Sequence, residues 1–160
     1  MGKKVLAAVD LNLITDSSAL YSIQLAARIQ GAIVLIVVST PIRGKRHGRS
    51  IVSVSDIDDS LNGWLDKLVE QSQQAGVTME IFFASGNFFE EITRFASFNP
   101  SVQFIVMAGP EEPNLAENSV FGQELKVLRE RFEGEILLVQ KAGQVTRVPD
   151  LRLRDPSREI

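Results

Sequence analysis

Residues 32–39 read AIVLIVVS, an apolar run in which β-branched side chains predominate. Because apolar and polar positions do not alternate, the run predicts a strand that is buried on both faces, as in a parallel sheet covered by helices on each side. Runs at 4–9, 103–107 and 135–140 have the same character. A more mixed run at 77–84 suits an edge position. The chain is therefore expected to contain a five-stranded parallel sheet.

Helical patterns lie between these strands, with the start and stop signals that helices use. The first expected helix starts at Asp16 and stops at Gly31, and the second starts at Ser55 with Asp58 and stops at Gly76. The third starts at Asn87 with Glu90. The fourth carries Leu125, Leu128 and Phe132 and stops near Gly134. Strand and helix thus alternate along the chain, which predicts an open doubly wound α/β fold with helices on both faces. In such folds ligands bind at the carboxyl ends of the strands. The expected site combines Asp10, residues 38–40 and the loop that begins at Gly109.

Size and composition restrict the function classes. The chain has 160 residues, of which 44% are hydrophobic and 23% charged, with a net charge of -3 and no cysteine. One domain over residues 1–140 is expected, followed by an extension over 141–160. The net charge provides no attraction to nucleic acid or to an anionic membrane, and no apolar run reaches the roughly 20 residues of a membrane span. We expect a cytoplasmic protein without disulfides or cysteine–metal sites.

Residues 106–122 read VMAGPEEPNLAENSVFG and set two glycines, Gly109 and Gly122, thirteen positions apart. At these residues, and at Val9-Asp10 and Ala19-Leu20, the chain resembles the universal stress protein family over about residues 3 to 140. The resemblance implies strand order 3-2-1-4-5. The nucleotide-binding members carry Gly-x2-Gly-x9-Gly-Ser/Thr after the fourth strand, and the spacing of Gly109 and Gly122 is that of the first and third glycines.

The chain departs from this motif at two positions. Glu112 stands where the middle glycine belongs, next to Glu111, and Gln123 stands where Ser or Thr belongs. Glycines let backbone N–H groups close around a phosphate, whereas a carboxylate about 4 Å from a phosphate repels it by ~4 kcal/mol at an effective dielectric near 20. The motif is therefore degenerate for ATP. In an alternative interpretation a bound Mg²⁺ would recruit the acids as ligands.

The resemblance implies two functions. The first is a non-enzymatic, dimeric stress-response or regulatory protein that acts through protein contacts, with weak or no ATP binding and no required cofactor. The second is a nucleotide sensor for ATP or AMP. Its candidate site residues are Asp10, Val38, Ser39, Gly109, Gly122 and Gln123. A slow ATPase is a third alternative, although no Ser-His-Asp set, Walker lysine or metal-ligand cluster accompanies these residues.

Other segments have both structural and functional interpretations. The basic segment 43–49, which contains the single histidine, His47, is either a solvated loop or a flap over an anionic ligand. Of the pair Phe82 and Phe83, one ring is expected in each layer of the core. Members of the family commonly dimerise through the last strand, here Ile136–Gln140, so we expect a homodimer. The extension 141–160 alternates apolar and basic residues, and it is expected to be disordered or to dock on a partner subunit.

Overall fold

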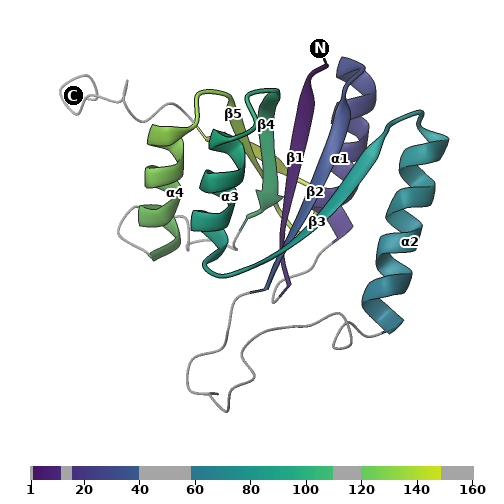
Figure 1. Ribbon diagram of the computed structural model, residues 1–160, viewed down its shortest axis with the longest axis horizontal. Helices are drawn as coiled ribbons and strands as arrows, with labels where there is room; N and C mark the ends of the chain where they lie inside the picture. The colour runs from purple at the N-terminus through teal and green to yellow at the C-terminus, as the bar shows by residue number, and fades with distance from the viewer. Residues whose placement is uncertain (1, 12–15, 40–58, 110–119, 149–160) are drawn as a thin grey trace.

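The computed structural model describes residues 2–11, 16–39, 59–109 and 120–148, which form one sheet with helices on both faces (Figure 1). The strands are β1 (Lys4–Asp10), β2 (Ala32–Ser39), β3 (Met79–Ser85), β4 (Val102–Ala108), β5 (Glu135–Val139) and β6 (Val145–Val148). The helices are α1 (Asp16–Ile29), α2 (Asp59–Gln74), α3 (Phe88–Ser97) and α4 (Val120–Arg131). Within the described part of the chain, none of these helices has the length and apolar character needed to cross a membrane.

The sheet confirms the expected topology and adds one strand to it. Its order is β3-β2-β1-β4-β5-β6, so the first five strands follow the predicted order 3-2-1-4-5. These five are parallel to their neighbours, and in the β1–β2 register Asp10 lies opposite Val38. The reversal of strand order occurs at β1, between β2 and β4. The carboxyl ends of β1 and β4 are therefore the place where a doubly wound sheet opens for a ligand.

Burial on both faces explains why the central strands are continuously apolar. In β1, Val5, Ala7 and Val9 belong to the core that packs on α1 and α2, whereas Leu6 and Ala8 belong to the core under α3 and α4. All five side chains are at most 4% exposed. Because successive residues of a strand point to opposite faces, each position needs an apolar side chain when helices cover both faces.

The edge strand β3 differs from the expectation for its phenylalanines. Both Phe82 and Phe83 were expected in the core, but their side chains are 44% and 54% exposed. Phe82 is partly covered on the α3 side, where its ring centroid lies 5.5 Å from that of Phe95. The reason for the difference is position, since β3 pairs only with β2 in the described sheet and helices cover an edge strand less completely than a central one.

The sixth strand corrects the expectation that β5 is the last strand and lies at the edge of the sheet. The chain turns at Lys141–Gly143, and β6 pairs antiparallel with β5, with Val148 opposite Ile136 and Val145 opposite Val139. Gly143 has φ 99°, a backbone conformation that glycine adopts readily, and the Gln140 N–H donates to the Gln144 carbonyl at 2.7 Å. Residues 145–148 of the expected extension thus belong to the chain's own sheet. Residues 149–160 lie outside the described part.

Candidate binding site

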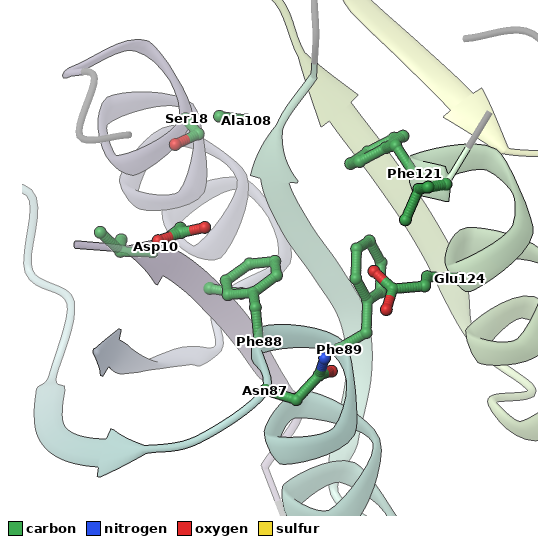
Figure 2. Close-up of a pocket in the computed structure, with 11 residues that line it drawn as sticks. Asp10, Ser18, Asn87, Phe88, Phe89, Ala108, Phe121 and Glu124 are labelled. Atoms are coloured by element: carbon green, nitrogen blue, oxygen red, sulfur yellow. The ribbon is translucent and has the colours of Figure 1, made fainter. Parts of the chain in front are cut away.

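A cavity of about 300 Å³ opens at the carboxyl ends of β1 and β4 (Figure 2). The ends of these strands and the beginnings of α1, α3 and α4 surround it, which is the location that the topology predicts for a ligand. Its lining residues are Ala8, Val9, Asp10, Ser18, Asn87, Phe88, Phe89, Ala108, Val120, Phe121 and Glu124. Seven of these eleven have apolar side chains, so the cavity is mainly apolar with a few polar groups at defined places.

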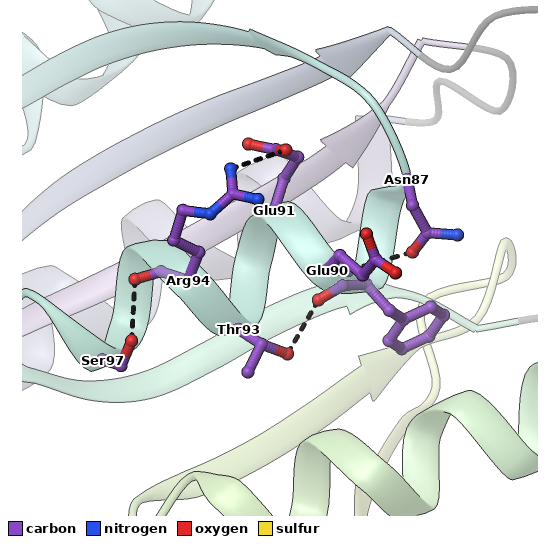
Figure 3. A network of polar contacts seen from close by, with 7 residues as sticks. Asn87, Glu90, Glu91, Thr93, Arg94 and Ser97 are labelled. Atoms are coloured by element: carbon purple, nitrogen blue, oxygen red, sulfur yellow. Dashed lines mark hydrogen bonds and ion pairs between the residues drawn. The ribbon is translucent and has the colours of Figure 1, made fainter.

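The start of α3 is fixed by a local signal in the sequence. Asn87 is the N-cap, with φ -75° and ψ 128°, and its side-chain oxygen accepts a hydrogen bond from the Glu90 N–H at 2.9 Å (Figure 3). Further along the helix, Glu91 forms an ion pair with Arg94 at 2.8 Å. The cap confirms the helix start expected from Asn87 and Glu90. It fixes the point at which the next two residues, Phe88 and Phe89, enter the cavity wall.

Three phenylalanine rings form one wall of the cavity. The ring centroids of Phe88 and Phe89 are 5.3 Å apart at an interplanar angle of 87°, and those of Phe89 and Phe121 are 5.4 Å apart at 73°. These are edge-to-face arrangements, which match the positive edge of one ring to the negative face of the next. Phe89 is buried and packs in the core, while Phe88 and Phe121 are half-buried. The wall thus joins α3 to α4 across the cavity.

Two of the described lining residues carry a charge, and both are carboxylates. Asp10 ends β1, Glu124 lies in the second turn of α4, and both are half-buried. In Figure 2 their side chains flank the rings of Phe88 and Phe89. None of the lining residues that the structure describes is a lysine, arginine or histidine. Among the described residues, no group of three or more histidine, cysteine or acidic side chains is arranged to hold a metal ion.

Of the expected site residues, Asp10 lines the cavity, and Val38 and Ser39 lie next to it in the sheet. The Val38 carbonyl accepts a hydrogen bond from the Leu11 N–H at 2.9 Å, directly after Asp10. The Ser39 carbonyl accepts from the Gly86 N–H at 3.0 Å. Both residues are buried. The three residues therefore lie together at the carboxyl ends of β1 and β2, but Val38 and Ser39 do not line the cavity itself.

The residues of the glycine motif take different positions. Gly109 follows β4, and its N–H donates to the Val139 carbonyl at 2.9 Å, which continues the pairing of β4 with β5. A Cβ atom at Gly109 would come 3.0 Å from Gln140 Nε2 and 3.2 Å from Leu138 Cβ, so close packing against β5 is one reason for a glycine at this position. Gly122 and Gln123 lie in the first turn of α4, next to the lining residues Phe121 and Glu124 but not among them.

Several sequence-based interpretations concern residues outside the described part of the chain. They are the acids Glu111 and Glu112, the basic segment 43–49 with His47, and the capping pair Ser55 and Asp58. The functions assigned to them remain predictions from the sequence.

Several lining residues are not among the site residues expected from the sequence, including Ser18, Asn87, Phe88, Phe89, Phe121 and Glu124. A usable signal was present. In a parallel α/β fold each helix begins near the edge where the strands end, so the first turns of the helices face the ligand site. Phe88 and Phe89 open α3, and Phe121 opens α4 together with Val120. Phe88 and Phe89, which directly follow the N-cap, both line the cavity, and Phe89 is also buried in the core.

Comparison with known proteins supports the fold. No family model matches the sequence, and no curated protein matches it. In three dimensions the chain is similar to a universal stress protein from Lactobacillus plantarum, with a TM-score of 0.56 and 16% identity over 85% of this chain and 96% of that one. A protein of the same family from Burkholderia pseudomallei gives a TM-score of 0.52 and 23% identity over 67% and 81% of the two chains.

A third similar structure, an AMP-bound universal stress protein family member from Arabidopsis thaliana, gives a TM-score of 0.50 and 12% identity over 97% and 98% of the two chains. At these levels of sequence identity, the structural similarity establishes the fold alone. The chain has the universal stress protein fold, as the sequence motifs predicted.

Proposed function

We propose that the chain is a non-enzymatic regulatory protein of the universal stress type, which acts through protein contacts and binds ATP weakly or not at all. The observation that carries this proposal is the charge of the cavity: Asp10 and Glu124 line it, and none of its lining residues in the described part of the chain is a lysine, arginine or histidine. A triphosphate would bring further negative charge to a site whose described lining residues include no positive side chain to balance it. The degenerate glycine motif, with Glu112 and Gln123, supports the same conclusion.

The proposed protein contacts rest on the outer strands of the sheet. Phe82 and Phe83 on β3 and Val145 on β6 are large apolar side chains with 39% or more of their surface exposed. We propose that two copies associate on the β5–β6 side, as the resemblance to dimeric relatives implied for residues 136–140. Because β6 pairs with β5, the second copy would meet β6 first.

The test of the proposed function is a calorimetric titration with ATP and Mg²⁺, with AMP alongside. We expect no saturable heat for ATP up to millimolar concentration, which corresponds to a binding free energy weaker than about -4 kcal/mol. The variant Glu112→Gly restores the missing glycine, and Glu124→Gln removes one carboxylate from the cavity. Each is expected to increase the affinity for ATP, and saturable micromolar binding by the unmodified protein would contradict the proposal.

A nucleotide sensor is the second candidate function. It is favoured by the position of Asp10, Val38 and Gly109 at one edge of the sheet and by the AMP and cAMP bound in similar structures. In this case AMP would bind in the micromolar range, and Asp10→Ala would weaken that binding at least about tenfold because the acid would have been a direct contact. An AMP affinity that Asp10→Ala leaves intact would exclude this cavity as the nucleotide site.

A further inference from the structure

A groove lies between α3 and α4, which run side by side on one face of the sheet (Figure 1). Its volume is about 520 Å³. The described residues that line it recur at intervals of three or four positions on each helix, so the groove follows both helix axes. They are Asn87, Phe89, Glu90, Thr93, Arg94 and Ser97 from α3 and its N-cap, and Glu124, Val127 and Arg131 from α4.

The groove carries its charges in a defined order. Glu90 and Glu124 lie nearer the starts of the two helices, and Arg94 and Arg131 lie nearer their ends. Figure 3 shows this order along α3. Arg94 forms an ion pair with Glu91 at 2.8 Å, while the side chain of Arg131, at the last position of α4, is exposed. A segment that fits this order carries acidic charge at the helix ends and basic charge at the helix starts.

The chain leaves the described sheet beside the arginine end of this groove. Val148 is the last described residue, and its carbonyl accepts a hydrogen bond from Arg129 Nη1 at 3.3 Å. Arg129 lies in the last turn of α4, close in sequence to Arg131. Residues 149–160, which read PDLRLRDPSREI, therefore begin next to the end of α4.

The sequence of this segment matches the groove in the direction in which it would enter. Its first charged residue is Asp150, and the next two are Arg152 and Arg154. Leu151 and Leu153 alternate with them, and alternate side chains of an extended segment point to opposite sides. One side of the segment is therefore apolar, and the other is acidic first and basic afterwards.

We propose that residues 149–154 bind in extended form in the α3–α4 groove of their own chain, running from the helix ends toward the helix starts. Asp150 pairs with Arg131 and Arg154 pairs with Glu124 at the rim of the groove, where the charged ends of these side chains stay near water. The two leucines of the segment cover Val127, which is 48% exposed. This surface goes beyond the proposed function, because it requires no ligand in the cavity.

The segment is long enough for this position. An extended residue advances the chain by about 3.3 Å, so residues 149–154 span roughly 20 Å. Passing the end of α4 takes about 10 Å, the diameter of a helix, and Arg131 lies about 10 Å from Glu124 along the helix axis. The segment thus brings Arg154 to Glu124. Because Glu124 also lines the cavity, the bound segment ends at the cavity rim.

A spin label on the segment tests its position. The chain contains no cysteine, so Ser157→Cys provides a single attachment site for a nitroxide, and NMR measures the intensity that each backbone amide signal of the full chain loses. We expect the amides of Glu90 and Glu124, near the helix starts, to lose more intensity than the amide of Arg131. Equal or greater loss at Arg131 is the pattern of a segment tethered only at Val148, and it would overturn the proposal.

Charge exchange tests the pairing. Arg154→Glu and Glu124→Lys are each expected to lower the ratio of bound to unbound segment about threefold, because each replaces an attraction with a repulsion. The double variant is expected to restore the intensity loss at the helix starts. Glu130→Lys, the same change of charge at an exposed position of α4 that does not line the groove, is the matched control and should leave the loss unchanged. A double variant without recovery, or an effect of Glu130→Lys equal to that of Glu124→Lys, would overturn the proposal.

A mixed sample distinguishes the chain's own groove from that of a partner subunit. Spin-labelled chain at natural isotope abundance is equilibrated with ¹⁵N-labelled chain that carries no spin label. We expect the signals of α3 and α4 in the ¹⁵N-labelled chain to keep their intensity. Selective loss at Glu90 and Glu124 there would place the segment in the groove of the partner and overturn its assignment to its own chain. Saturable ATP binding in the calorimetric titration would remove the proposed function and leave this surface in place.

Discussion

Arg129 is a charged side chain inside the protein, with only 4% of its surface exposed. Its guanidinium donates to the carbonyls of Phe132 at 2.5 Å, Gly134 at 2.7 Å and Val148 at 3.3 Å. The first two acceptors follow the end of α4, and the third belongs to β6. This single side chain therefore ties the end of the helix to the added strand, and carbonyls near a helix C-terminus are favourable acceptors for a cation.

Replacing Arg129 with methionine is expected to lower the free energy of unfolding by about 2 kcal/mol. The three carbonyls lose their donor, although removal of a buried charge recovers part of that cost. Urea denaturation measures the change. The stability of Arg129→Lys should fall between those of the unmodified protein and Arg129→Met, because an ammonium group keeps the charge but lacks the planar fork of the guanidinium. The exposed Arg131 provides the control, since Arg131→Met should stay within about 0.5 kcal/mol of the unmodified protein. Equal stability of Arg129→Met and Arg131→Met would contradict this assignment.

The N-cap of α3 is the local interaction that positions the aromatic wall of the cavity. We expect Asn87→Ala to lower the free energy of unfolding by about 1 kcal/mol, because the Glu90 N–H loses its acceptor. Asn87→Ser keeps a capping oxygen without adding charge, so it should be nearly neutral. Urea denaturation of both variants, with hydrogen exchange of the α3 amides, measures the effect. Loss of stability in the serine variant equal to that in the alanine variant would show that the side-chain oxygen does not stabilise the helix start.

At the level of elements, the sequence predicted the central strands, because local patterns of side chains determine their positions. The central strands are buried on both faces and their apolar runs are unbroken, so their positions were evident. β6 (Val145–Val148) was not predicted, because the alternating residues of the extension 141–160 were expected to be disordered or to dock on a partner subunit. The available signal was Gly143, a glycine in a short turn between two segments with strand character, which is a hairpin pattern. Exposure of Phe82 and Phe83 depends on how far helices extend over an edge, which no local pattern encodes.

The candidate site was predictable to a similar extent. Asp10 and Val38 followed from the rule that ligands bind at the carboxyl ends of the strands, and both lie at that edge. Glu124 was not anticipated, because its place in the cavity depends on how α4 packs against α3. That packing is made by side chains far apart in the sequence, such as Phe89 and Phe121. The charge of the cavity, on which the proposed function rests, is thus a tertiary property.

At the scale of the whole molecule, the described sheet ends in two different strands. β3 pairs only with β2, and β6 pairs only with β5. Each outer strand has an exposed apolar side chain, 54% for Phe83 and 39% for Val145. Strand edges with exposed apolar side chains are places where a second chain can add by backbone pairing. The proposed homodimer forms at the β6 edge. The same substitution made at the β3 edge can therefore serve as the comparison.

We expect Val145→Asp to weaken association of the homodimer at least about tenfold, because a carboxylate on the outer strand of the proposed contact would lose water without gaining a partner. Phe83→Asp introduces the same charge at the opposite edge and should leave association unchanged. Sedimentation velocity at micromolar concentration measures both variants beside the unmodified protein. A monomeric unmodified protein would rule out the dimer. If Phe83→Asp dissociated the dimer and Val145→Asp did not, the interface would lie on β3.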